Sequence, residues 1–137
     1  MFSPPAIIVH GLDHARTALR PGLPVTLLSA PGAALYAGCG WWRALVAAAR
    51  MEFPGTQGTD LLDCGDAPGR AMAALRIGQR GLILDPACPA FPAVAAAAGT
   101  LGATVLPHRP ASLDLAQPGA ARLLSVWLRG DNNVRLG

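Results

Sequence analysis

Five short apolar runs recur along the chain, and each is followed by a segment with helical spacing. The runs lie at residues 6–9, 25–28, 59–63, 82–84 and 103–106. Short apolar runs bounded by turn residues predict buried strands. Helices are predicted at residues 12–20, within 33–51, and at 69–79, 91–98 and 120–128. Strands that alternate with helices predict an α/β fold with a parallel sheet and right-handed crossovers.

The alternation leaves two strand orders open. A doubly wound, flavodoxin-like sheet has the order 2-1-3-4-5 and carries helices on both faces. An open half TIM barrel has the order 1-2-3-4-5 and leaves its inner face and both edges to be covered. Because apolar strands must be buried on both faces, the sequence favours the flavodoxin-like sheet. We expect residues 1–137 to form one (βα)5 domain, with a frayed polar tail at 130–137.

Two of the helical segments predict which side chains are buried. In the segment that ends at Met51, an apolar stripe is formed by Trp41, Leu45, Val46 and Ala49. Gly38 and Gly40 can divide this region into two helices. Consecutive tryptophans point in different directions on a helix, so one of Trp41 and Trp42 is expected in the core and the other at an interface. In the segment at 69–79, the expected core residues include Met72, Leu75 and Ile77, and the arginines face solvent.

Composition narrows the classes of function. Hydrophobic residues make up 52% of the chain and charged residues 14%, which predicts a globular domain with a partner surface, most simply in a homodimer. All eleven basic residues are arginine. The absence of lysine excludes a Schiff-base lysine, lysine-bound pyridoxal phosphate and a P-loop lysine. The arginines are spread singly, so we expect no nucleic-acid partner.

The cysteines and the long uncharged runs indicate the cellular compartment of the protein and whether it spans a membrane. Three cysteines without a CxxC pair, and no visible signal peptide, predict reduced thiols in a cytoplasmic protein. Residues 21–42 and 86–107 carry no charge, but proline and glycine interrupt both runs. They are interpreted as buried strand–loop–helix segments, and no membrane span is expected.

The ends of the predicted strands carry the candidate chemistry. In open α/β sheets, ligands bind at the carboxyl ends of the strands. Those ends carry His10, Ser29, Asp63 with Cys64, Asp85 and His108. Gly32 follows Pro31 at the start of a helix, where backbone N–H groups can bind an anion, although a tight turn explains it equally. We therefore predict His10, Ser29, Gly32 and Asp85 as ligand-binding residues.

Four segments between Gly11 and His108 together resemble the first five βα units of class II (metal-dependent) fructose-bisphosphate aldolases. They are Leu12-Asp13-His14-Ala15-Arg16, the stretch from Pro24-Val25 to Pro31-Gly32-Ala33-Ala34-Leu35-Tyr36-Ala37-Gly38, Leu62-Asp63-Cys64-Gly65, and the stretch from Ala74 to Asp85. The resemblance implies that Asp63 matches the catalytic acid/base. The family's next residue is a metal-binding histidine, which is Cys64 here, and its glutamate after the fifth strand falls on His108. A complete barrel needs about 250 residues, so the second half of an aldolase site is absent from this chain.

These departures favour a non-catalytic, aldolase-derived domain that binds a small ligand or a protein partner at the strand ends. Asp63 then only caps a helix or binds loop amides. The first alternative is a small metal-dependent lyase that uses Asp63 as a general base. Cys64 and His108 are the candidate zinc ligands, but two are too few without Asp63, Asp85 or His10. The second alternative, a flavodoxin-like phosphate or nucleotide binder, lacks a glycine-rich fingerprint after the first strand. We expect no other cofactor.

Overall fold

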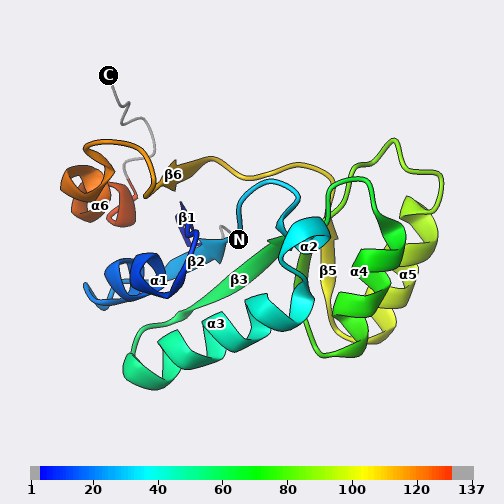
Figure 1. Cartoon of the computed structure of the whole chain (residues 1–137), viewed down its shortest axis with the longest axis horizontal. Coiled ribbons are helices and arrows are strands. Elements are labelled where there is room, and N and C mark those ends of the chain that lie inside the picture. The colour runs from blue at the N-terminus through cyan, green and yellow to red at the C-terminus, as the bar shows by residue number, and fades with distance from the viewer. Residues whose placement is uncertain (1–3, 131–137) are drawn as a thin grey trace. The chain divides into compact units, whose positions relative to one another are not determined.

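The computed structural model describes residues 4–130, in which strands and helices alternate (Figure 1). The strands are β1 (Ala6–Ile8), β2 (Val25–Leu28), β3 (Gly58–Asp63), β4 (Gly81–Ile83), β5 (Thr104–Leu106) and β6 (Ser112–Asp114). The helices are α1 (Leu12–Leu19), α2 (Ala33–Tyr36), α3 (Cys39–Glu52), α4 (Pro68–Arg76), α5 (Phe91–Thr100) and α6 (Ala120–Leu128). Except for Gly130, the predicted tail at 130–137 lies outside the described residues.

The described strands form an open parallel sheet with the order β5-β4-β3-β2-β1-β6. The α/β class and the parallel sheet are confirmed, but the favoured order 2-1-3-4-5 is wrong. The flavodoxin-like order places β3 beside β1, whereas here β6 pairs with β1 on the side away from β2. Ile7 faces Leu27 on one side and Leu113 on the other. The sheet thus contains the order 1-2-3-4-5 of the alternative, extended by a sixth strand that the sequence did not predict.

The chain divides into two compact units. The first comprises Met1–Leu28, Leu45–Thr59 and Pro110–Gly137, and the second comprises Ser29–Ala44 and Asp60–Arg109. The prediction of a single domain stays a prediction.

The first unit contains β1, β2 and β6 with helices α1 and α6. All four residues of β2 are buried, as expected for a strand covered on both faces. Helix α1 packs on β2, and α6 packs on β6. Trp127 of α6 is buried and donates from Nε1 to the carbonyl oxygen of Ala6 at 2.9 Å. Buried Thr56 donates from Oγ1 to the carbonyl oxygen of Leu19 at 2.8 Å.

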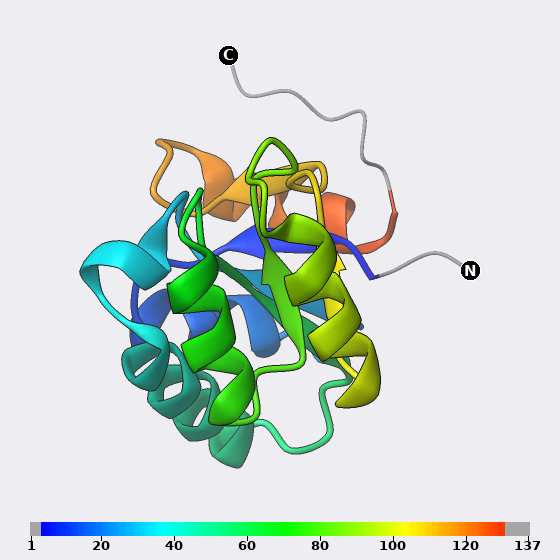
Figure 2. The same ribbon diagram turned by 90° about the vertical axis from the view of Figure 1, so that its right-hand side faces the viewer.

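The second unit contains β4, β5 and the last four residues of β3, with helices α2, α4 and α5. Figure 2 shows α4 and α5 side by side, and α5 packs on β5. The core of this unit is formed by Leu62, Leu82, Leu84, Ala71, Ala74, Val94 and Ala98. Each of the strands β3, β4 and β5 therefore ends within this unit, which places their carboxyl ends together.

Two burial predictions need correction. The predicted helical region up to Met51 does divide, into α2 and α3, but Trp42 is fully buried while Trp41 is 36% exposed. With Trp42, the buried stripe of Leu45, Val46 and Ala49 has the i, i+3, i+4, i+7 spacing of one helical face. Ile77 is 49% exposed because α4 ends at Arg76, and Gly78 turns the chain away with φ +95°.

Candidate functional site

An open cleft of about 630 Å³ lies at the carboxyl ends of β3, β4 and β5, within the second unit. We call it the strand-end cleft. It is lined by Asp63, Gly65, Asp66, Ile83, Asp85, Pro86, Pro107, His108 and Arg109. The structure thus brings together three of the predicted site residues, Asp63, Asp85 and His108, at the edge of the sheet where the sequence placed them.

Asp63 is held from several directions at the end of β3. Its side chain is 7% exposed, and its Oδ2 accepts from Arg109 Nη1 at 2.7 Å. Its Oδ1 accepts from the backbone N–H of Gly65 at 2.8 Å. The backbone N–H of Asp63 donates to Ser29 Oγ at 2.9 Å. Both carboxylate oxygens therefore have a partner already, one of them a charged guanidinium.

Arg109 connects the segment after β5 to the end of β3. Its Nη2 donates to the carbonyl oxygen of Ser29 at 3.0 Å, while Nη1 binds Asp63. The arginine side chain is 24% exposed and lines the cleft. Pro107 and His108 precede it on the same wall. This wall of the cleft is therefore fixed to the strand ends through one ion pair and one hydrogen bond.

Gly65 allows the turn that separates Asp63 from Asp66. Its φ is +56°, a conformation that residues with a side chain rarely adopt. Its carbonyl oxygen accepts from the backbone N–H of Asp85 at 2.8 Å, which connects the ends of β3 and β4. The backbone N–H of Cys64 also donates to the carbonyl oxygen of Ile83 at 2.8 Å. Together these bonds hold the floor of the cleft.

Three side chains of the cleft face solvent. Asp66, Asp85 and His108 are all exposed. Asp85 Oδ1 accepts from the backbone N–H of Ala87 at 2.9 Å, so one of its two carboxylate oxygens is engaged within the protein. Within residues 4–130, no side-chain hydrogen bond or ion pair engages Asp66 or His108. These three groups are the ones that a ligand can reach without displacing a contact of the protein.

Three other predicted ligand-binding residues do not line the strand-end cleft. Ser29 is fully buried, and its hydroxyl accepts from Asp63 and donates to the carbonyl oxygen of Ala30 at 3.1 Å. Gly32, at φ +65°, precedes the four-residue helix α2. His10 belongs to the first unit, where its Nε2 lies 2.8 Å from Asp114 Oδ1. Its backbone N–H donates to Nδ1 of His14 at 3.1 Å.

Cys64 is poorly suited to bind a metal. Its side chain is fully buried and points away from solvent, with Sγ 3.8 Å from the carbonyl oxygen of Leu62. Burial, followed by the nearby Asp63 carboxylate and Cys39, raises the pKa of the thiol from 9.0 to about 12. Only the thiolate is a good metal ligand. Within the described residues, no group of three or more histidine, cysteine or acidic side chains could hold a metal ion. A zinc site shared by Cys64 and His108 therefore gains no support.

The buried thiol predicts a specific pH dependence of stability. The folded protein keeps the Cys64 proton up to a pKa of about 12, whereas the unfolded chain loses it near pH 9. The contribution of the protonated Cys64 thiol to folding stability is therefore complete below pH 9 and is lost as the pH rises towards 12. We expect urea unfolding to show a loss of about 2 kcal/mol between pH 8 and pH 10.5 that is absent in Cys64→Ala. Parallel losses in both proteins would contradict the assignment.

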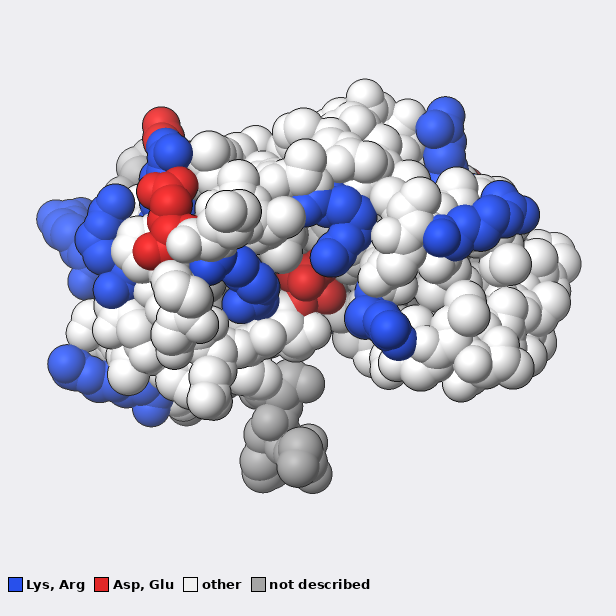
Figure 3. Space-filling model, turned by 90° about the horizontal axis from the view of Figure 1, so that it is seen from below, with Lys and Arg blue, Asp and Glu red and all other residues white. Residues whose placement is uncertain are grey.

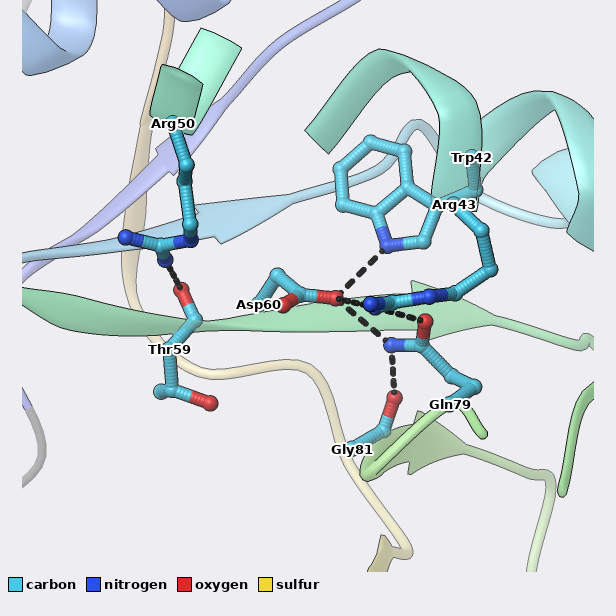
Figure 4. A network of polar contacts seen from close by, with 7 residues as sticks. All are labelled: Trp42, Arg43, Arg50, Thr59, Asp60, Gln79 and Gly81. Atoms are coloured by element: carbon cyan, nitrogen blue, oxygen red, sulfur yellow. Dashed lines mark hydrogen bonds and ion pairs between the residues drawn. The ribbon is translucent and has the colours of Figure 1, made fainter. Parts of the chain in front are cut away.

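A second polar cluster in this unit surrounds Asp60 (Figure 4). A single oxygen, Oδ2, accepts from Trp42 Nε1 at 3.0 Å and from Gln79 Nε2 at 2.8 Å, and Arg43 Nη1 lies 3.4 Å away. Buried Gln79 also donates to the carbonyl oxygen of Gly81 at 2.9 Å. Because the buried polar atoms of this cluster find their partners within the protein, the cluster stabilises the unit and is not a candidate binding site.

Sequence reasoning missed two residues of the cleft, Arg109 and Asp66. Asp66 lies three residues after Asp63 in the same turn, so the turn itself could have indicated it. Arg109 directly follows His108 after the fifth strand, but arginines in loops are usually solvated. Only the folded chain shows that Arg109 reaches Asp63, which is 46 residues earlier in the sequence.

Comparison of the sequence with models of protein families and with curated proteins found no match. These comparisons identify no family, and the structure shows an α/β fold with a six-stranded parallel sheet in the described residues. No helix between residues 4 and 130 is both long enough and apolar enough to span a membrane.

Proposed function

We propose that this chain is a non-catalytic, aldolase-derived domain that binds a small polar ligand in the strand-end cleft. The main support for this proposal is that the charged and polar side chains of the cleft fall into two groups, one bound within the protein and one open to solvent. Asp63 and Arg109 bind each other in the wall, whereas Asp66, Asp85 and His108 face solvent. The position of Asp63 at the end of β3, and the consecutive order of β1 to β5, support an origin among aldolase-like barrels.

The charges of the cleft indicate which ligand groups it suits. The Asp63 carboxylate and the Arg109 guanidinium compensate each other at 2.7 Å. Asp66 and Asp85 then remain as hydrogen-bond acceptors at the opening, beside the imidazole of His108. Carboxylates accept from hydroxyl and amino groups and repel anions. A small polyol or amino alcohol therefore fits the cleft better than a phosphate or a nucleotide.

The lyase alternative is less well supported by the same contacts. A general base must accept a proton from its substrate at hydrogen-bond distance. Each Asp63 oxygen already accepts one hydrogen bond, from Gly65 or Arg109, and the side chain is only 7% exposed, so little of the carboxylate is accessible to a substrate. The lyase alternative is supported by one observation, which is that Asp63 lines the cleft. Cleavage of a ketose bisphosphate that is lost in Asp63→Asn would establish it in place of our proposal.

Binding can be measured by saturation-transfer NMR with glycerol, ethanolamine and methyl phosphate as probes, each of which carries carbon-bound protons. We expect glycerol or ethanolamine to bind and methyl phosphate to give no signal. Asp85→Asn should weaken that binding by about fivefold or more, because a hydrogen bond to a charged group is worth roughly 1.5–3 kcal/mol. The matched variant Asp13→Asn, on α1 of the first unit, should leave it unchanged. Equal weakening by both variants would show that the cleft is not the site.

We also propose that the protein is a homodimer. Tyr36 is 71% exposed and Leu35 is 42% exposed, and only 14% of the residues are charged. Figure 3 shows uncharged residues over much of one face, between separated arginines. Exposed apolar side chains such as Leu35 and Tyr36 are commonly buried between subunits. Light scattering at micromolar concentration should give the mass of a dimer, and the mass of a monomer would contradict this proposal.

A further inference from the structure

A second cavity lies between helices α4 and α5 of the second unit. We call it the α4–α5 groove. It has a volume of about 410 Å³ and is lined by Pro68, Gly69, Met72, Arg76, Ala90, Ala93 and Val94. It shares no residue with the strand-end cleft. In Figure 2 the two helices face the viewer side by side.

The lining of the groove is apolar and made largely of small side chains. Val94 is 2% exposed and forms part of its floor, and Met72 is half-buried. Gly69 and Ala93 are exposed at its sides. Side chains this small let the backbone of another helix approach closely, and the flexible Met72 can adapt to its surface. The groove therefore suits the apolar face of a helix.

Helices α4 and α5 carry two charged side chains, Arg70 and Arg76, and both are positive. The adjoining segments add Arg80 and two acidic residues, Asp66 and Asp85. Asp85 lines the strand-end cleft, and Arg76 lines the groove itself. All three arginines are exposed. Apolar side chains continue beyond the groove, with Ile77 49% exposed and Leu101 51% exposed.

We propose that the α4–α5 groove binds an amphipathic helix of a partner protein whose apolar face is flanked by acidic residues. Opposite charge around an apolar contact gives such an interface its specificity. A second copy docked through the same face would bring two arginine-bearing faces together, and like charges across an interface are unfavourable. The lining contains no aromatic ring on which nucleic-acid bases could stack.

The test uses two designed helical peptides with leucine at positions i, i+3, i+4 and i+7. One carries glutamates beside the leucine face, and the other carries lysines at the same positions. Fluorescence anisotropy should give a dissociation constant below about 1 mM for the glutamate peptide. The dissociation constant of the lysine peptide should be at least about tenfold higher. Ala93→Glu, inside the groove, should abolish binding. Ala96→Glu, exposed on α5 but outside the groove lining, should not.

Charge reversal separates recognition from a general effect on folding. Arg76→Glu should weaken binding of the glutamate peptide and strengthen binding of the lysine peptide, each by several-fold. The circular dichroism spectrum of the protein should not change. Binding of both peptides with equal affinity, or of neither, would overturn the proposal. It would also be overturned if Ala93→Glu converted a dimer into a monomer in sedimentation equilibrium, because a second copy would then occupy the groove.

Discussion

Replacing Arg109 with alanine is expected to lower the free energy of unfolding by about 2–4 kcal/mol. The substitution leaves the Asp63 carboxylate, which is 7% exposed, without its charged partner. It also removes the bond from Nη2 to the carbonyl oxygen of Ser29. Water from the cleft can hydrate Asp63 in part, which keeps the loss below that of a fully enclosed charge. Urea unfolding at pH 7 measures the difference.

Two further variants show whether the loss comes from this ion pair. Arg122→Ala removes an exposed arginine from α6 and should cost less than about 0.5 kcal/mol. The double variant Asp63→Asn with Arg109→Ala should be more stable than Arg109→Ala alone, because no buried charge is then left unpaired. A loss below about 1 kcal/mol for Arg109→Ala would mean that Arg109 does not hold the wall of the cleft.

Gly58→Ala is expected to destabilise the protein by at least about 3 kcal/mol. Gly58 begins β3 with φ +145°, which is essentially restricted to glycine. A Cβ atom there would overlap the carbonyl oxygen of Val25. Backbone atoms in a strand cannot move aside as a flexible side chain can, so the strain cannot be relieved locally. The midpoint of thermal unfolding should fall by more than about 10 °C, or the variant should fail to fold.

Gly55→Ala is the matched control for this change. Gly55 lies three residues earlier, and an added Cβ would meet no atom within 4 Å. The control should change stability by less than about 1 kcal/mol in either direction. If the two variants were equally stable, the close approach of β3 to β2 at Gly58 would be refuted.

The strands were predictable because each of the first five is an apolar run next to a turn. The predicted starts near 6, 25, 59, 82 and 103 lie within one residue of those observed. β6 was not predicted because Ser112–Asp114 has a single apolar residue, Leu113, which does not form an apolar run. Its partner β1 lies more than 100 residues away in the chain. Such pairing depends on tertiary contacts and leaves little trace in a local pattern.

The strand order could not be read from the alternation of elements. Both candidate orders need the same number of strands, the same parallel direction and similar crossovers. Coverage of both strand faces favoured the wrong order, and β6 pairs with β1 at an edge that neither candidate order filled. The choice between Trp41 and Trp42 was open to better prediction, because only Trp42 has the i, i+3, i+4, i+7 spacing with Leu45, Val46 and Ala49.

The location of the candidate site at the strand ends could be predicted from the sequence. The hydrogen bonds and ion pairs within it were much harder to predict. The rule that parallel strands present their carboxyl ends at one edge correctly joined Asp63, Asp85 and His108. It could not distinguish Ser29, which supports the backbone of Asp63, from a residue that reaches a ligand. The partner of Asp63 was beyond prediction, since any of eleven arginines could have filled that role.

The most direct test of the ligand-binding account is a map of backbone amide shifts during titration of the isotopically labelled protein with glycerol or ethanolamine. We expect the largest changes on Gly65, Asp66, Asp85 and His108, which line the strand-end cleft. We also expect these changes to persist in Asp63→Asn, since Asp63 forms part of the wall. Changes centred on another surface, or no saturable change at any amide, would refute ligand binding in this cleft.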